Sequence, residues 1–392
     1  MRQRILLVTP RSPFSKKGAC EQDRAYGIES LVSMGFDIEV IVKTFPSGIE
    51  KITEESEKLG IRVIPVPYKS VRNILKRIWN PLFWDGAAYE YYDQEIQDIF
   101  KTELKNFKPD FVWFDYTYLW PLYWHAKEMG IPIITRSVNF EPVHFLQEDG
   151  LSLVNLVKFF IKFLSELIVV KRSNLIFSIT PKEEKMYRRL GAKNVINLPL
   201  RGLPWVLKDT RIIKDKDTLD IFFMGSTYNV EHNRRALEFL LHDIVPHVNA
   251  LAPGKFIFHI LGAKVPGGME KYFKDNIVYE GYVKDLDAFL KNMDIAVIPS
   301  LFGAGMQQKI FEPLARGIPT ITSSRGIAGY PFKDKEHLLL ADSKQDFIDA
   351  ILALLNVNLR KEISLNSLML CNGTFTKECI EDIIARGLGI SA

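Results

Sequence analysis

Apolar residues follow two different spacings along this chain. Short runs rich in β-branched residues alternate with longer stretches in which apolar positions recur every three or four residues. The short runs predict strands buried on both faces, and the longer stretches predict amphipathic helices. Predicted strands of the first half are Ile5–Thr9, Ile38–Val42, Val63–Pro65, Phe111–Asp115, Ile131–Thr135 and Leu175–Ser178. Predicted helices between them are Asp23–Ser33, Tyr89–Asn106, Leu119–Met129, Leu151–Arg172 and Lys182–Leu190.

The alternation stops around residues 197–217 and then starts again. Pro199, Gly202 and Pro204 precede the charged run KDTRIIKDKD, which is typical of a connection between domains. Further strands are predicted at 220–224, 256–261, 277–280, 295–299 and 320–323, with helices between and after them. Strands separated by helices in this way form right-handed βαβ units. We therefore expect two consecutive parallel-sheet α/β domains, at residues 1–203 and 204–375.

Composition places the chain among ordinary globular proteins. Its 392 residues are 47% hydrophobic and 25% charged, which excludes a disordered or collagen-like chain. The net charge of +4 is too small to indicate nucleic-acid binding. Cys20, Cys371 and Cys379 lack the spacing of a disulfide framework or a zinc site and suit a reducing compartment. With no signal-peptide pattern and no uncharged run of about 18 residues, we expect a cytoplasmic protein.

The strongest local signal is residues 299–319, PSLFGAGMQQKIFEPLARGIP. A predicted strand ends here, a glycine-bearing loop follows, and a helix is predicted from Met306 or Gln307 to Ala315. Lys309 falls near the first turn of that helix, with Glu312 on the same face. A cation beside phosphates and a carboxylate beside ribose hydroxyls would suit a nucleoside diphosphate. The alternative is a plain strand–loop–helix with a solvated Lys–Glu pair.

Four stretches of the second half, 222–248, 256–264, 277–330 and 337–351, together resemble the GT-B glycosyltransferases of the retaining group called family 4 or group 1. The resemblance implies two Rossmann-like domains facing each other across a cleft, with an acceptor domain first and a nucleotide-sugar domain second. It also implies that residues 376–392 form a helix that packs back on the first domain. The implied reaction moves a sugar, with retention, from a nucleotide-diphosphate-sugar to a hydroxyl of a glycan or lipid-linked saccharide in surface polysaccharide biosynthesis. The donor is then a co-substrate, and no cofactor is expected.

The resemblance also implies roles for residues of the donor side. Glu312 matches the second glutamate of the family's E-x7-E motif, which binds ribose. Lys309 resembles the basic residue that contacts the donor diphosphate. The first glutamate of that motif falls at Ala304, so the contact with the sugar must come from elsewhere. The other donor-side positions are Gly225, Ser226, Arg234, Tyr282, Val283, Gly303, Ala304, Gly305 and Met306. For Arg234, an ordinary exposed helix arginine is the alternative.

On the acceptor side, the resemblance points to the loop at Gly18 and to the segment SVNFEPVHF, which contains Asn139 and Glu141. Val138 stands where the family has a histidine. His144, six residues on, is a candidate replacement, and a structural surface histidine is the alternative. Glu141 would hydrogen-bond either an acceptor hydroxyl or only its neighbouring backbone.

Other motifs carry less weight. Asp285-Leu-Asp287 spells the D-x-D of metal-dependent glycosyltransferases, but it precedes a predicted helix, where Asp is a favoured N-cap. The resemblance implies metal-independent chemistry. Fingerprints of dehydrogenases, P-loop NTPases and α/β-hydrolases do not occur. Two alternatives stay open: a GT-B nucleotide-sugar epimerase, and a non-catalytic subunit, which Ala304 and Val138 favour.

Two stretches bear on membranes. Residues 69–84 combine four cations with Trp79, Phe83 and Trp84, which suits peripheral contact with an anionic lipid surface at the inner face of a membrane. A solvated helix with buried aromatics is the alternative. Leu151–Val170 carries Lys158, Lys162 and Glu166 as one narrow polar stripe, and we expect it to be packed in the first domain.

Overall fold

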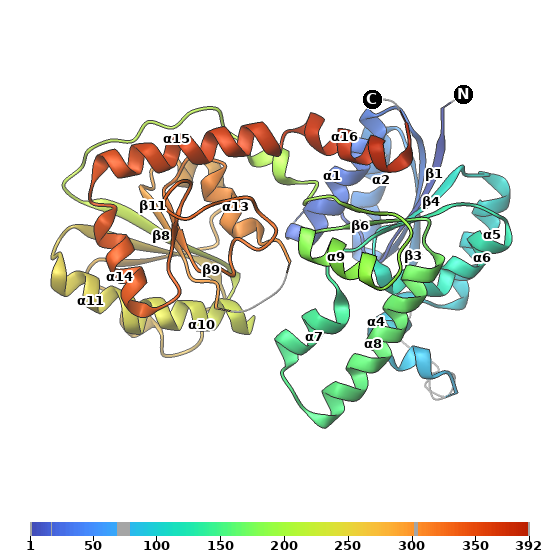
Figure 1. Ribbon diagram of the computed structural model, residues 1–392, viewed down its shortest axis with the longest axis horizontal. Helices are drawn as coiled ribbons and strands as arrows, with labels where there is room; N and C mark the ends of the chain where they lie inside the picture. Colours follow the sequence, from blue (N-terminus) through green and yellow to red (C-terminus); the bar gives the residue numbers. More distant parts are fainter. Residues whose placement is uncertain (1, 17, 69–78, 302–304, 391–392) are drawn as a thin grey trace. The chain divides into compact units, whose positions relative to one another are not determined.

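The chain folds into two compact units, each built around one parallel sheet. The computed structural model describes residues 2–16, 18–68, 79–301 and 305–390. Domain 1 comprises Met1–Gly202 and Lys377–Ala392, and domain 2 comprises Leu203–Thr376. Figure 1 shows the helices around each sheet. The two α/β domains confirm the predicted fold class.

Domain 1 has a seven-stranded sheet of order β3-β2-β1-β4-β5-β6-β7, and all neighbouring strands are parallel. Its strands are β1 (Arg4–Thr9), β2 (Asp37–Thr44), β3 (Arg62–Pro67), β4 (Phe111–Phe114), β5 (Ile133–Arg136), β6 (Leu175–Ser178) and β7 (Val195–Asn197). Its helices are α1 (Ala19–Ser33), α2 (Ile49–Leu59), α4 (Gly86–Tyr91), α5 (Gln94–Asn106), α6 (Tyr123–Glu128), α7 (Glu141–Asp149), α8 (Leu153–Arg172), α9 (Pro181–Arg189) and α16 (Lys377–Leu388), with short 3₁₀ turns η1 (Pro46–Gly48), η2 (Pro81–Trp84) and η3 (Thr117–Leu122). The last helix, α16, contacts α1 and β7.

Both faces of this sheet are buried, which explains the continuous apolar runs of its strands. Ile5 and Leu7 of β1 belong to one hydrophobic cluster, together with Trp113 of β4. Leu6 and Val8 belong to the cluster on the opposite face. Because side chains alternate along a strand, neither face of β1 is free for a polar site. Chemistry is therefore confined to the ends of the strands.

Two predicted helices of domain 1 are divided in the structure. The stretch Tyr89–Asn106 forms α4 and α5, because Asp93 caps a new helix by accepting a hydrogen bond from the Ile96 N–H (3.0 Å). The stretch Leu119–Met129 begins as the 3₁₀ turn η3 and becomes α6 only at Tyr123, since Pro121 cannot donate a backbone hydrogen bond.

A buried ion network holds α1 against the carboxyl ends of β4 and β5. The Asp23 carboxylate accepts from the backbone N–H of Arg201 (2.7 Å), from its Nη2 (2.7 Å) and from Arg136 Nη2 (3.3 Å). Arg201 Nη2 also donates to Asp115 (2.8 Å). All four side chains are essentially inaccessible to solvent. Burial alone would raise the pKa of Asp23, but Arg201 and Arg136 outweigh it, and the pKa is lowered.

Because Asp23 neutralises two buried guanidinium groups, its removal is expected to be costly. We expect Asp23→Ala to lower the unfolding free energy of domain 1 by about 3–5 kcal/mol, since unpaired buried charges are left behind. The measurement is urea unfolding followed by tryptophan emission, which reports mainly domain 1 because only Trp205 lies outside it. The matched control is Asp37→Ala, which removes an exposed carboxylate of domain 1. Equal losses in both variants would contradict the assigned role of the network.

Domain 2 has a six-stranded parallel sheet of order β10-β9-β8-β11-β12-β13. Its strands are β8 (Leu219–Thr227), β9 (Phe256–Ala263), β10 (Ile277–Gly281), β11 (Ile295–Ile298), β12 (Thr320–Thr322) and β13 (Leu339–Leu340). Its helices are α10 (Glu231–Phe239), α11 (Val245–Leu251), α12 (Leu286–Leu290), α13 (Gln308–Leu314), α14 (Lys344–Ala353) and α15 (Val357–Thr374), with the π-helical turn η5 (Leu240–Ile244) and the 3₁₀ turns η4 (Leu203–Val206) and η6 (Glu270–Tyr272). From β8 the chain builds outward to β10 and then returns to the other side of β8 with β11. The connection order therefore reverses between β8 and β11.

Candidate functional site

The reversal between β8 and β11 defines the place where domain 2 can hold a ligand. In an open parallel sheet, ligands bind outside the carboxyl ends of the two strands at which the connection order switches. Strand β8 ends at Thr227 and leads to α10, and β11 ends at Ile298 and leads to α13. The loop after β11 includes Gly303 and Ala304, two predicted donor-side residues that lie outside the described residues. The predicted site residues on both sides of this loop are described.

One asparagine, Asn233, links Lys309 of α13 to the end of β8 by hydrogen bonds. Its Nζ donates to Asn233 Oδ1 at 3.1 Å. The Asn233 side-chain amide in turn donates to the Thr227 carbonyl (3.1 Å) and to Ser226 Oγ (3.5 Å). The structure thus brings together the predicted residues Lys309 and Ser226. Asn233, which the resemblance left without a role, connects them.

The Lys309 side chain is partly buried, and the described residues place no neutralising charge beside its ammonium. Burial lowers its pKa from the ordinary 10.5 to about 8. Among the described residues, its polar contact is the neutral Asn233 amide, and no carboxylate lies within ion-pair distance of its ammonium. A cation in a poorly solvated place is unstable unless an anion joins it. This position therefore favours a negatively charged ligand.

Glu312 has different partners from Lys309, so the two do not form the solvated pair that was the alternative. Glu312 is buried, with only 8% of the residue exposed to solvent. Arg316 Nη1 donates to Oε2 at 2.7 Å, and Gln308 Nε2 donates to Oε1 at 3.1 Å. These contacts fix the orientation of the carboxylate. Each oxygen keeps acceptor capacity for a further donor such as a hydroxyl group.

The described part of the loop before α13 is anchored by side chains. Gly305 has a φ of +72°, which explains a glycine there. Met306 is buried. Gln307 Nε2 donates to Ser300 Oγ (2.7 Å), and its carbonyl accepts from the Tyr330 hydroxyl (3.2 Å). Helix α13 begins at Gln308, close to the predicted start.

A close approach of two glycines shapes the end of β8. Gly225 is buried, and a Cβ at Gly262 of β9 would stand 2.3 Å from the Gly225 carbonyl oxygen. Gly262 also has a φ of +137°. Any side chain at residue 262 would therefore displace the backbone that precedes Ser226. Gly262 was not predicted as a site residue, although it follows a strand directly in the sequence.

Three predicted donor-side residues have no described contact with Lys309. Arg234 is half-exposed and lies 3.9 Å from Glu238, one turn along α10, which matches the alternative of an ordinary helix arginine. Tyr282 is 76% exposed. It follows β10 together with Val283, and β9 separates that strand from β8.

Both aspartates of the D-x-D sequence make contacts within the protein. Asp285 caps α12, accepting a hydrogen bond from the Ala288 N–H at 2.9 Å, so the N-cap prediction is confirmed. Asp287 is bound by Arg316 Nε (3.1 Å) and by Lys208 Nζ (3.0 Å). Both carboxylates therefore have partners within the protein.

In domain 1, Glu141 is held by two tyrosines. It lies at the start of α7, and its two carboxylate oxygens accept from the Tyr116 hydroxyl (2.9 Å) and the Tyr118 hydroxyl (2.8 Å). Burial raises its pKa, and nearby His144 only partly offsets that effect. The described partners of the carboxylate are therefore two side-chain hydroxyls, and its contact with an acceptor hydroxyl stays a prediction. His144 lies one turn further along the same helix.

The other acceptor-side residues lie in loops. Gly18 is exposed just before α1, and a Cβ there would have no neighbouring atom within 4 Å. Asn139 follows β5, and its carbonyl accepts from the Ser137 hydroxyl (3.0 Å). The Gly18 loop follows β1, at the reversal of connection order between β1 and β4, whereas Asn139 follows β5, the next strand beyond β4.

Sequence reasoning missed one cation at this edge of domain 1. Arg24 of α1 is 6% exposed, and its guanidinium lies over the Tyr116 ring at 5.4 Å. Its Nε has no hydrogen-bond partner among the described residues. The sequence could have indicated this cation only by its position, because Arg24 lies in the first helix after β1 and Tyr116 follows β4.

Comparison with known proteins bears on the fold of the chain. Residues 218–357 match the family described as glycosyl transferases group 1. HepE from Anabaena, solved with UDP-glucose, superimposes with a TM-score of 0.65 at 12% identity, over 99% of this chain and 100% of HepE. TarM gives 0.71 at 11% identity, over 99% and 98% of the two chains. A putative UDP-N-acetylglucosamine 2-epimerase from Listeria monocytogenes gives 0.55 at 11% identity, over 95% and 94%. No curated protein sequence is significantly similar to the chain.

The fold is therefore that of the GT-B proteins, with two Rossmann-like domains in one chain. Within it, residues 218–357 match the glycosyl transferases group 1 family, which is the family that this part of the sequence resembles. Both Lys309 and Asn233 lie within the matched residues.

The unusual pKa of Lys309 predicts a measurable effect on stability. The difference between a pKa of 10.5 in the unfolded chain and about 8 in the folded protein corresponds to a destabilisation of the folded state by roughly 3 kcal/mol. This destabilisation is complete below pH 8 and is lost as the pH rises toward 10.5. We expect Lys309→Met to stabilise domain 2 by about 1–3 kcal/mol at pH 7, with the difference from the wild type shrinking above pH 8 and vanishing only above about pH 10.5. The measurement is calorimetric unfolding across that range.

The matched control for this prediction is Lys361→Met, an exposed lysine of α15. It should leave both the stability and its pH dependence nearly unchanged. A Lys309→Met variant that is less stable than the wild type at pH 7 would show that the ammonium is not buried at a cost.

Proposed function

We propose that the protein is a retaining, metal-independent glycosyltransferase. It moves a sugar from a nucleotide-diphosphate-sugar to a hydroxyl of a glycan or lipid-linked saccharide in surface polysaccharide biosynthesis. The observation that carries the proposal is the partly buried Lys309 ammonium, held by Asn233 at the carboxyl ends of β8 and β11. A diphosphate supplies the negative charge that this position lacks. The complexes of HepE with UDP and with UDP-glucose support a uridine nucleotide as the first donor to test.

The assigned roles follow from the charges that develop during transfer. As the bond between the sugar and the diphosphate breaks, negative charge grows on the leaving phosphate. Lys309 then stabilises that charge more strongly than it stabilises the ground state, and this difference is what accelerates the reaction. Ser226, exposed at the end of β8, donates to the same phosphates. Because Asn233 positions the ammonium before the donor arrives, little reorganisation is needed.

Glu312 is assigned to the ribose. Its carboxylate is oriented by Arg316 and Gln308 and retains acceptor capacity for the ribose hydroxyls. The loop at residues 303–306 is assigned to the sugar and diphosphate. Tyr282 and Val283 remain predictions for the base. Metal independence is supported by Asp285 and Asp287, since both carboxylates of the D-x-D sequence have partners within the protein.

The acceptor is assigned to domain 1, at the loops of Gly18 and Asn139 and at α7. Glu141 and His144 lie in α7, and Arg24 is a buried cation nearby whose Nε has no described partner. An acceptor carrying a phosphate or a carboxylate would supply a counter-ion for Arg24. Whether His144 replaces the family histidine stays a prediction. Peripheral membrane contact through 69–84 also remains a prediction, because residues 69–78 lie outside the described residues.

Donor binding is predicted to depend on the charge of Lys309. We expect Lys309→Gln to weaken UDP binding by about 10–100-fold in titration calorimetry at pH 7, since a charge-assisted contact to phosphate is lost. In the wild type, affinity for UDP should fall by up to about tenfold per pH unit above pH 8, where Lys309 loses its proton.

Two variants serve as controls for the binding experiment. Lys309→Arg keeps its charge and should bind UDP with little change in affinity from pH 8 to 10. Lys291→Gln removes an exposed lysine and should bind like the wild type. Unchanged binding in both Lys309→Gln and Glu312→Gln would contradict the placement of the donor site.

The reaction itself is tested with the nucleotide sugar alone and with an acceptor. For a transferase, we expect a UDP-sugar alone to give at most slow hydrolysis, and an added saccharide acceptor to yield a product that keeps the anomeric configuration, measured by NMR. Excess EDTA should leave the rate unchanged. Isomerisation of the sugar without an acceptor would instead identify an epimerase, a function that the similarity to the Listeria protein also allows. Binding without either reaction would indicate a non-catalytic subunit.

A further inference from the structure

One buried arginine of domain 1 has no partner for its charge among the described residues. Arg24 of α1 is 6% exposed. Across the described parts of the chain its guanidinium makes no hydrogen bond and no ion pair, and its Nε is closed off from solvent without an acceptor. The contact that it does make is with the Tyr116 ring, whose centroid lies 5.4 Å from Cζ. That contact leaves all the N–H donors of the guanidinium unused.

The other buried arginines of the described chain show what such a side chain normally has in this protein. Each of them donates hydrogen bonds to carboxylates or backbone carbonyls, with at least one bond of 2.6–2.9 Å. They are Arg136, Arg201, Arg316 and Arg360. A guanidinium has five N–H donors and no acceptor, so burial without oxygen partners is unfavourable. Arg24 therefore has a requirement for oxygen atoms that the described residues do not meet.

The carboxylate next to Arg24 in the sequence does not supply the missing charge. Asp23 is bound by Arg201 (2.7 Å) and by Arg136 (3.3 Å), and Arg201 also binds Asp115. This network contains two carboxylates and two guanidinium groups, so it is neutral without Arg24. The cation of Arg24 is thus an excess charge beside a balanced cluster.

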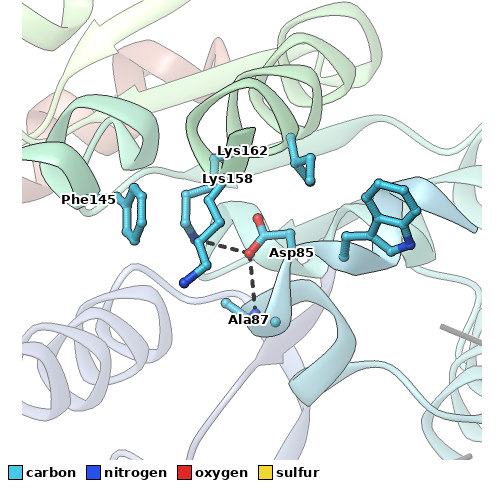
Figure 2. Close-up of a pocket in the computed structure, with 8 residues that line it drawn as sticks. Asp85, Ala87, Phe145, Lys158 and Lys162 are labelled. Carbon is cyan, nitrogen blue, oxygen red and sulfur yellow. Dashed lines mark hydrogen bonds and ion pairs between the residues drawn. The ribbon is translucent and has the colours of Figure 1, made fainter. Parts of the chain in front are cut away.

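The carboxylate of α7 that shares Tyr116 with this guanidinium is not its counter-ion either. The two oxygens of Glu141 accept from the hydroxyls of Tyr116 (2.9 Å) and Tyr118 (2.8 Å). Tyr118 in turn accepts from Lys162, whose charge is neutralised by Asp85 at 3.0 Å. Figure 2 shows this ion pair. The acidic groups of these contacts are therefore all occupied by other donors.

Arg24 lies at the place where domain 1 can hold a ligand. Helix α1 follows β1, Tyr116 follows β4, and the connection order of the sheet reverses between these two strands. In an open parallel sheet, ligands bind outside the carboxyl ends of the strands at such a reversal. Gly18, which precedes α1, and Glu141 are assigned to the acceptor. The unpaired guanidinium is thus on the acceptor side of the protein.

We propose that Arg24 binds an oxyanion of the acceptor, a phosphate or a carboxylate, and that the enzyme selects acceptors that carry one. This inference rests on the proposed transferase function and narrows its acceptor from a saccharide in general to an anionic one. The planar guanidinium matches either group, because it presents parallel N–H donors to two oxygens. The Tyr116 ring stabilises the cation without using those donors.

The first experiment measures anion binding without any nucleotide sugar, so its outcome is independent of the transferase proposal. Titration calorimetry follows inorganic phosphate, and separately acetate, with the whole chain carrying Lys309→Gln, which removes the cation assigned to the donor. We expect binding of at least one anion, and the anion that binds identifies the acceptor group as phosphate or carboxylate. Adding Arg24→Gln should weaken that binding at least about tenfold, because a charge-assisted contact is lost.

The second experiment measures transfer from a UDP-sugar to glucose 6-phosphate, glucuronic acid and glucose. We expect the wild type to show a lower KM for an anionic saccharide than for glucose. Arg24→Gln should raise the KM for the anionic saccharide at least about tenfold, change its kcat by less than about twofold, and leave the KM for glucose unchanged. Arg24→Lys keeps the charge but not the paired donors, so its KM should be intermediate. Absence of transfer to any acceptor would contradict the transferase proposal, while the first experiment still decides whether Arg24 binds an anion.

The matched control is Arg189→Gln, which removes an exposed arginine of α9 in domain 1 and should leave the anion affinity and every KM unchanged. Arg24→Gln should stay folded, since it leaves no other charge unpaired. Absence of anion binding, or equal affinity with and without Arg24, would overturn the proposal. Weaker UDP binding in Arg24→Gln would assign Arg24 to the donor, and loss of the fold would assign it a structural role; either result would also overturn it.

Discussion

A parallel sheet that is buried on both faces leaves only the ends of its strands for chemistry. In domain 1, the two faces of β1 belong to two different hydrophobic clusters. In domain 2, the strand order reverses between β8 and β11, and the loops that follow these two strands meet at one edge. The candidate donor site lies there because the rest of the sheet is covered. The position of Lys309 is a consequence of this constraint.

At the candidate donor site, the feature that would favour binding of an anion lowers the stability of the fold. A partly buried ammonium whose described polar partner is a neutral amide destabilises the folded protein, and desolvation lowers its pKa to about 8. The same desolvation strengthens its attraction to an anion. By contrast, the buried charges of Asp23, Arg136 and Arg201 neutralise one another and serve the fold of domain 1. The two clusters differ in that a carboxylate neutralises the cations of domain 1, whereas the described residues place none beside Lys309.

Helix α8 shows how the same residues can be placed in two opposite ways. Its sequence has one narrow polar stripe, and a helix with such a stripe is expected to turn that side to water. The structure instead bonds Lys162 and Glu166 to side chains of domain 1 and leaves the apolar side exposed. Periodicity reports which residues share a face. It does not indicate which of the two faces contacts other elements of the folded protein.

The sequence by itself determined the class of fold, most of the strands, and the position of Lys309 and Glu312 after a strand end, because these depend on local spacing. It did not determine that Asn233 holds Lys309, that Arg316 holds Glu312, or that two tyrosines hold Glu141. Lys309 and Asn233 are 76 residues apart along the chain. Residues so far apart along the chain come into contact only when the strands pair in a particular order. The tertiary structure alone therefore decided these contacts, the burial of the charges and the side of α8 that faces solvent.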